Sequence, residues 1–158
     1  MEEEKIEELI IKTCKELYKK DRYLIEKNIC ERTIVFRFGI YMQEFMNKDN
    51  SFKNYDLDIE YNKNLDERKS TSNNPNGRYV DLIIHKRGYN YSNLLCIEFK
   101  KKIISKVDRT KIDELMSPME VYQYKYGATI TFKTDRVIYF IKSYMGGWRM
   151  KELLLPQI

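Results

Sequence analysis

The chain has 158 residues, and 29 basic against 24 acidic side chains give it a formal net charge of +5 at pH 7. This length suits one domain that buries a substantial core, and the mild positive excess favours contact with phosphate backbones without requiring it. The sequence contains no apolar run long enough to cross a membrane, and its acidic start lacks the basic segment of a secretory signal. We therefore expect a cytoplasmic protein with no membrane partner.

The three cysteines, Cys14, Cys30 and Cys96, are scattered along the chain without the paired spacing of zinc ligands. Two of them fall on apolar positions, as reduced thiols in a core do. We expect neither a disulfide framework nor a zinc site.

Two amphipathic helices are predicted at the start of the chain, over residues 2–20 and 31–47. In the first, the stripe that faces the core consists of Ile6, Leu9, Ile10, Thr13, Cys14 and Leu17. In the second, one stripe at helical spacing consists of Glu31, Val35, Phe38, Met42 and Phe45. The Glu31 carboxylate should therefore point the way the core residues point. An acid in a first turn also stabilises the helix dipole, so capping is the alternative to a role in a site.

Residues 55–61 alternate between apolar and acidic side chains, which predicts a strand with one face on the core. The side chains predicted to face inward are Tyr55, Leu57, Ile59 and Tyr61, and those predicted to face solvent are Asp56, Asp58 and Glu60. Residues 62–77 hold few apolar residues and several turn formers, so we expect one long flexible loop. Such a loop either orders over a bound nucleic acid or is an ordinary mobile connection.

Residues 78–85 and 94–100 are two strand-like segments whose faces are both largely apolar, as in central strands. Alternation along the first segment places Asp81 with Tyr79, Ile83 and His85, and places Val80, Leu82 and Ile84 on the opposite face. Alternation along the second places Glu98 and Lys100 with Leu94 and Cys96. The Gly, Asn and Ser residues between the segments allow an antiparallel hairpin. Such a hairpin would bring Asp81 and Glu98 side by side.

This pairing of an acid on one strand with acid-x-Lys on the next can hold a metal ion for phosphate chemistry. Mg²⁺ takes carboxylate oxygens and keeps several waters for a phosphate substrate, and a nearby ammonium orients or deprotonates the attacking water. A Glu and a Lys on an apolar strand face are costly to bury unless they are paired or bound to a metal. The alternative is a buried charge network of Asp81, Glu98 and Lys100 without a catalytic role.

The rest of the chain continues the alternation of helix and strand. A helix is predicted over residues 108–116 and a strand over residues 126–132. Two further strand-like segments, residues 136–143 and 148–154, flank Gly146 and Gly147, a pair typical of a tight hairpin.

These segments resemble the PD-(D/E)xK nuclease superfamily, with Asp81 and the tripeptide Glu98-Phe99-Lys100 in the positions of its signature. The likeness is greatest to small, single-domain bacterial members, and Val80 stands where the motif name has Pro. The resemblance implies an α/β, restriction-endonuclease-like fold, with one domain over residues 1–158. It further implies a central mixed sheet of four to five strands flanked by helices, in the order α-α-β-β-β-α-β.

The same resemblance implies a nuclease that hydrolyses phosphodiester bonds with Mg²⁺ or Mn²⁺. By this likeness, Asp81, Glu98 and the backbone carbonyl of Phe99 bind the metal. Lys100 then positions the attacking water, and Glu31 supports the constellation directly or across a water.

Nucleic acid is the expected partner, with DNA ahead of RNA, and specificity would come from a homodimer or a protein partner. The candidate nucleic-acid contacts near the two strands are Arg78, His85, Lys86, Lys101 and Lys102. A solvated sheet edge would also carry such lysines, and a structural role is the alternative for His85. The rival function is a non-catalytic nucleic-acid-binding or protein-interaction module that keeps the same fold.

Overall fold

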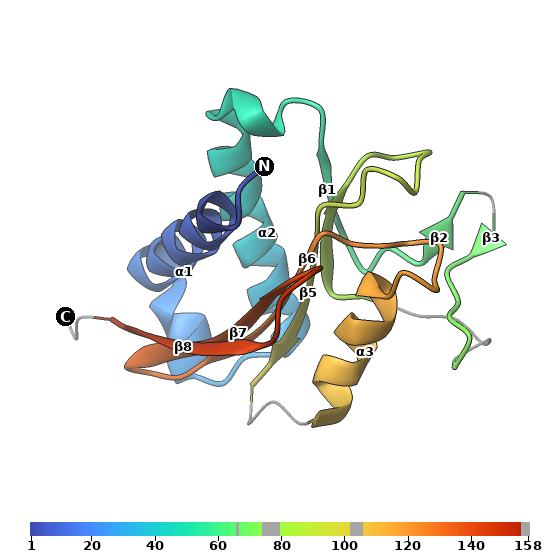
Figure 1. Cartoon of the computed structure of the whole chain (residues 1–158). Coiled ribbons are helices and arrows are strands. Elements are labelled where there is room, and N and C mark those ends of the chain that lie inside the picture. The colour runs from blue at the N-terminus through green and yellow to red at the C-terminus, as the bar shows by residue number, and fades with distance from the viewer. Residues whose placement is uncertain (66, 74–79, 102–105, 156–158) are drawn as a thin grey trace.

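A computed structural model describes residues 1–65, 67–73, 80–101 and 106–155 of the chain (Figure 1). It is an α/β structure in which two N-terminal helices precede the strands, and a third helix connects the middle of the sheet. The helices are α1 (Glu3–Glu26), α2 (Glu31–Asn47) and α3 (Lys106–Met116), with a short 3₁₀ turn at Asn50–Phe52. The strands are β1 (Asp56–Ile59), β2 (Lys63–Asn64), β3 (Glu67–Arg68), β4 (Leu82–His85), β5 (Leu95–Lys100), β6 (Tyr126–Phe132), β7 (Arg136–Ser143) and β8 (Arg149–Leu154).

The main sheet has six strands in the order β1-β4-β5-β6-β7-β8. All neighbours are antiparallel except β5 and β6, which are parallel and are connected through α3. A parallel pair needs such a crossover, because the chain must return to the same end of the sheet. The prediction of four to five strands is therefore wrong, since the C-terminal hairpin of β7 and β8 extends the sheet beyond β6.

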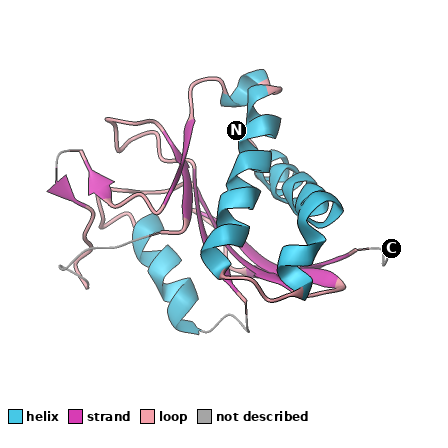
Figure 2. Cartoon of the chain, turned by 180° about the vertical axis from the view of Figure 1, so that it is seen from behind, coloured by secondary structure: helices cyan, strands magenta, loops and turns pink. Residues whose placement is uncertain are grey.

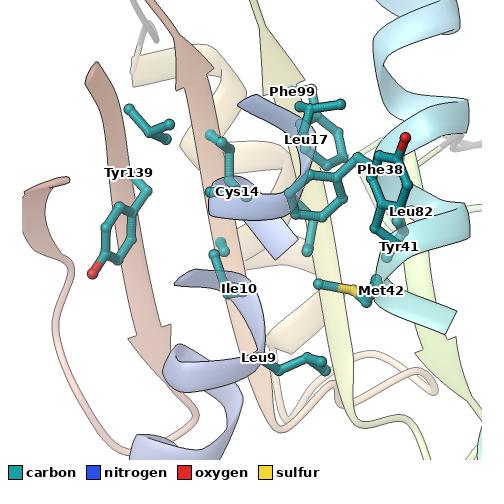
Figure 3. Packing of buried hydrophobic residues seen from close by; sticks show 14 of the residues in the cluster. Leu9, Ile10, Cys14, Leu17, Phe38, Tyr41, Met42, Leu82, Phe99 and Tyr139 are labelled. Atoms are coloured by element: carbon teal, nitrogen blue, oxygen red, sulfur yellow. The ribbon is translucent and has the colours of Figure 1, made fainter. Parts of the chain in front are cut away.

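The sheet separates two layers of helix, with α1 and α2 on one face and α3 on the other (Figures 1 and 2). The larger core lies under α1 and α2, where Phe38 meets Phe99 edge to face with ring centroids 5.0 Å apart (Figure 3). The predicted helical stripes supply this layer, because Ile10, Leu17 and Met42 are all fully buried in it. Both helices therefore bury their apolar faces against the protein's own sheet.

The smaller core lies between the sheet and α3 and is made of Val80, Ile83, Cys96, Ile112, Leu115, Met116, Tyr122 and Tyr124. Gly127 lets α3 come close to the sheet, since a Cβ at this position would lie 2.3 Å from Ile112 Cγ2 and 2.5 Å from Met116 Sδ. Val80 belongs to this layer together with Ile83, whereas alternation predicted it on the face of Leu82. The reason is that β4 begins only at Leu82 and Asp81 lies in a bend, so the period of two does not extend back to Val80.

A similar break in alternation follows β1. Glu60 adopts a left-handed backbone conformation, with φ at +52°, which is uncommon for a residue with a side chain. Tyr61 is consequently directed to the α3 side, where its ring contacts His85 at 4.7 Å between centroids. The prediction that Tyr61 shares a face with Leu57 and Ile59 is wrong for this reason.

Residues 63–65 and 67–73, which the sequence presents as part of a long flexible loop, contain β2 and β3 and several contacts with the rest of the protein. The centre of these contacts is Lys69, a side chain only 2% exposed. Its Nζ donates to Tyr124 Oη at 2.9 Å and lies over the rings of Tyr61, Tyr122 and Tyr124. Residues 74–77 of the expected loop lie outside the described residues.

Within the described ranges, none of the helices is both long and apolar enough to cross a lipid bilayer.

Candidate metal site at the ends of β4 and β5

Asp81 and Glu98 lie close to each other at the ends of neighbouring strands. In the antiparallel pair of β4 and β5, Leu82 is opposite Ile97, and Asp81, in the bend directly before Leu82, comes close to Glu98, the residue after Ile97. On the other side of Asp81, the Glu60 amide donates to its backbone oxygen at 3.1 Å. On the other side of Glu98, Thr129 of β6 is the registered partner. Glu60, Asp81, Glu98 and Thr129 are therefore neighbours at this end of the sheet.

The Glu98 carboxylate is buried and is held by two ammonium groups. Lys100 Nζ lies 3.4 Å from Glu98 Oε1, and Lys111 Nζ lies 2.6 Å from Glu98 Oε2. Glu98 is only 4% exposed, so its charge requires such partners. Lys100 also reaches Asp108 of α3, at 3.6 Å between Nζ and Oδ1. Glu98 and Lys100 thus share the sheet face covered by α3, as alternation predicted.

Asp81 is tied to the strand that carries Glu98. Its Oδ2 accepts a hydrogen bond of 2.7 Å from the backbone amide of Phe99. Asp81 also lines a cavity of about 450 Å³. The remaining lining residues are Cys30, Glu31, Arg32, Val35, Ile59 and Glu60.

Both acids hold protons more readily than exposed carboxyls do. Burial is the main reason that the pKa of Asp81 is raised, although the Phe99 amide and the charges of Lys111 and Lys100 oppose it. Burial also raises the pKa of Glu98, and the nearby charge of Asp81 raises it further against the two lysines. Burial alone would lower the pKa of Lys100, but Glu98 and Asp108 outweigh it and the pKa is raised. Buried acids whose charges are disfavoured by a neighbouring acid, as Asp81 is by Glu60 and Glu98 is by Asp81, form a site that a cation would stabilise.

Glu31 is the first residue of α2, and its place agrees with the predicted start of that helix. Its Oε2 accepts a hydrogen bond of 3.1 Å from the backbone amide of Lys101, directly after β5. Glu31 lines the same cavity as Asp81. The carboxylate therefore contacts the chain at the end of β5 from the helix side, and Glu31 is at the same time the acidic residue in the first turn of α2.

The donor set fits a hard cation better than a soft one. Within the part of the chain that the structure describes, no group of three or more His, Cys, Asp or Glu side chains could hold a metal. A cation at this end of the sheet would rely on Asp81 and Glu98, with backbone oxygen and water completing its shell. Mg²⁺ is bound in this manner, through one or two carboxylates and several waters, whereas a structural zinc site needs four protein ligands.

Sequence reasoning missed Lys111, which comes from α3. Asp108, Lys111 and Leu115 lie on one helical stripe at spacings of three and four residues, and Leu115 is fully buried. The two charged residues therefore continue the core-facing stripe toward the end of β5. This periodicity could have identified Lys111 from the sequence, since a charged residue on a buried helical stripe implies a partner of opposite charge on the sheet.

The predicted nucleic-acid contacts do not gather at one place. Lys101 follows β5 directly, and its Nζ donates to the Asn28 carbonyl at 3.0 Å. Lys86 follows the opposite end of β4, about 15 Å from Asp81 at the usual rise of a strand. Its Nζ lies over the Tyr89 ring, 4.8 Å from the centroid. Arg78 and Lys102 lie outside the described residues.

His85 is buried in a structural contact. Its Nε2 lies 2.8 Å from Asp58 Oδ2, and Arg87 holds the same carboxylate through Nε at 2.9 Å. Burial would raise the pKa of Asp58, but His85 and Arg87 outweigh it and hold that pKa well below its usual range. The prediction of a solvated Asp58 is wrong, because Asp58 balances the charges at the end of β4. This geometry favours the structural interpretation of His85 over contact with phosphate.

Comparison of the chain with protein-family models, with curated proteins and with solved structures found no match.

Proposed function

We propose that this protein is a metal-dependent nuclease that hydrolyses phosphodiester bonds of nucleic acid. The observation that carries the proposal is the nearness of Asp81, whose carboxylate accepts from the Phe99 amide, to Glu98 on the same strand as Phe99, with Lys100 in contact with Glu98. Asp81 lines a cavity of about 450 Å³ together with Glu31. Acids with raised pKa values beside a cavity mark a functional site more often than they result from packing alone.

The order of elements supports the finer fold within this proposal. Two helices, three sheet strands, α3 and the parallel strand β6 follow one another as in the restriction-endonuclease-like fold that the sequence resembles. In this interpretation β7 and β8 are an addition to the nuclease core, and β2 with β3 is an insertion before β4.

The position of each residue in the proposed site indicates its role in the reaction. Asp81 and Glu98, with the Phe99 carbonyl, would hold Mg²⁺ or Mn²⁺, which when bound supplies an acidified water and neutralises phosphate charge. Lys100 extends from the same strand face as Glu98, where its ammonium can orient the water and stabilise charge on the phosphate oxygens. Glu31 approaches from α2 and fixes the chain after β5 through the Lys101 amide. Its role is to keep the backbone of that segment in place.

DNA is the first substrate to test, as the sequence analysis expects, and the formal net charge of +5 favours contact with a phosphate backbone. Lys101 lies beside Glu31 and is the best placed of the predicted basic contacts. A homodimer or a protein partner would supply specificity to this short chain, as the sequence analysis expects.

A non-catalytic module with the same fold is the second candidate, and one observation favours it. Both oxygens of Glu98 already carry a lysine partner, so the charge of this buried group is balanced without a metal. A protein that never binds a cation would have the same arrangement. Metal binding therefore separates the two functions.

The test is incubation of the purified protein with Mg²⁺ or Mn²⁺ and a panel of single-stranded, duplex and branched DNA and RNA. We expect cleavage that requires the metal, stops with chelator and is lost in Glu98→Gln. The matched control is Glu152→Gln, which alters an exposed acid of β8 far along the sheet from Glu98. A protein that cleaves nothing and is not stabilised against heat by either cation is a binding module instead.

A further inference from the structure

Lys111 makes the closest contact to the Glu98 carboxylate. Its Nζ lies 2.6 Å from Glu98 Oε2, against 3.4 Å for the contact of Lys100 with Oε1. The Lys111 side chain is 18% exposed, and it comes from α3, whereas Glu98 belongs to the sheet. A charge-assisted hydrogen bond of this length between partly buried groups is strong and directional.

Ammonium groups already offset part of the negative charge at this end of the sheet, where Asp108 also contacts Lys100. Asp81 and Glu98 bring two negative charges, and Lys100 and Lys111 bring two positive ones. A divalent cation between the carboxylates would meet an ammonium already bound to one of its ligand oxygens. One ligand oxygen cannot serve both cations at full strength, so the ion and the Lys111 ammonium compete for it.

We propose that Lys111 is an internal cation that closes the metal site in the metal-free protein and yields Glu98 Oε2 to the metal when it binds. The inference rests on the proposed function and adds its regulation, because the affinity for metal is set by how firmly Lys111 holds Glu98. Lys100 keeps its place on the strand throughout, since its contact is to the other oxygen and to Asp108.

Thr129 supplies a second, independent observation. It is fully buried beside Glu98 on β6, and its Oγ1 has no hydrogen-bond partner among the described residues. A buried hydroxyl without a partner costs stability, and cross-strand neighbours lie on the same face of a sheet. The Thr129 hydroxyl is therefore in reach of the Glu98 carboxylate or of a water bound near it once Lys111 has moved. In this structure the Lys111 ammonium has a partner in Glu98, whereas the Thr129 hydroxyl has none among the described residues. This is the arrangement expected of the metal-free state, in which Lys111 holds Glu98.

The competing explanation is that Lys111 only fastens α3 to the sheet. The chain offers a matched pair for this comparison, because Lys142 of β7 contacts Asp113 of α3 at the same distance of 2.6 Å. The two lysines have similar side-chain exposure, 18% for Lys111 and 22% for Lys142. If both ion pairs only hold α3 against the sheet, removing either lysine should lower the stability of the protein and leave its metal affinity unchanged.

The experiment measures Mg²⁺ and Mn²⁺ affinity by calorimetry on wild type, Lys111→Gln and Lys142→Gln, together with the thermal midpoint of each metal-free protein. We expect Lys111→Gln to bind metal about tenfold more tightly, a change that calorimetry resolves easily, and to melt at a lower temperature without metal. Half-maximal cleavage should need correspondingly less metal. Lys142→Gln should bind metal as wild type does. Lys111→Arg keeps the competing charge and should not gain affinity.

Two results would overturn the inference, and they are distinct. If wild type binds metal and cleaves nucleic acid, but Lys111→Gln binds the metal no more tightly, then Lys111 only holds α3 against the sheet. The nuclease proposal would stand in that case. If wild type binds neither cation and cleaves nothing, the proposed function and the inference fail together. Should Lys111→Gln not fold, a gain of metal affinity in Lys111→Arg would equally contradict the proposal.

Discussion

The backbone amide of Phe99 donates a hydrogen bond to Asp81 Oδ2 at 2.7 Å, which ties the bend before β4 to the strand that carries Glu98. This contact fixes the position of one carboxylate oxygen of Asp81. It also connects the acidic pair through the backbone, so that the position of one carboxyl depends on the position of the other.

Asp81→Asn should separate metal binding from folding. The amide oxygen of Asn can still accept from Phe99, and burial already disfavours the charge of Asp81, so the metal-free protein should keep its thermal midpoint. The rise in midpoint that we expect Mg²⁺ to cause in wild type should disappear, because a neutral amide is a poor ligand for a hard cation. A metal-induced rise of the same size in both proteins would remove Asp81 from the site.

Lys100→Met should remove cleavage while the protein still folds and binds nucleic acid. Because the ammonium is proposed to act on the water and on developing charge, we expect the rate to fall by about 100-fold or more. Binding measured by fluorescence anisotropy should change little, since this partly buried group is not proposed to hold the duplex. The control is Lys53→Met at an exposed position before β1. Equal cleavage by wild type and Lys100→Met would end the catalytic role.

Glu31→Gln tests the role of the helix at the site. If Glu31 orders the chain after β5 through the Lys101 amide, metal-dependent cleavage should fall by roughly 10- to 100-fold, as for other groups that orient metal sites. A simple first-turn acid would instead cost about 1 kcal/mol of stability and leave activity intact. Thermal unfolding and cleavage are measured on the same variant, and a destabilised but fully active protein makes Glu31 a cap.

Periodicity predicted the parts of this structure that depend on neighbours along the chain. The start of α2 at Glu31 and the common face of Glu98 and Lys100 agree with the spacing of residues in each element. The nearness of Asp81 and Glu98 follows from a hairpin whose two strands the sequence already indicates. Local pattern and short connections suffice for these features, because each involves one element or one turn.

The remaining features depend on contacts between distant segments. Alternation predicted β7 and β8 as a hairpin but did not show that this hairpin joins the same sheet as β5 and β6. The left-handed backbone conformation of Glu60 interrupts the alternation that follows β1. A glutamate at this position gives no indication of that conformation, as a glycine would. Lys111 meets Glu98 only because α3 crosses over the sheet between parallel strands. Such pairings follow from the packing of layers and not from spacing.

Lys69 gives the protein a pH dependence that the sequence does not show. Burial beneath Tyr61, Tyr122 and Tyr124 lowers the pKa of Lys69 from 10.5 to about 8, against the pull of Cys96 and Asp58. Between these two values the unfolded chain keeps the proton while the folded protein releases it. Because the unfolded state then binds more protons, the free energy of unfolding rises with pH across this window.

Lys69→Met should lack this gain. We expect wild type to gain about 2 kcal/mol of unfolding free energy relative to Lys69→Met between pH 7.5 and 9.5, as a shift of this size implies. Chemical denaturation at several pH values measures it, and the difference between the two proteins cancels groups that titrate in both. Lys53→Met, at an exposed position, should follow wild type. Ring faces also attract an ammonium, so a difference that stays flat with pH would show that the tyrosines keep Lys69 charged.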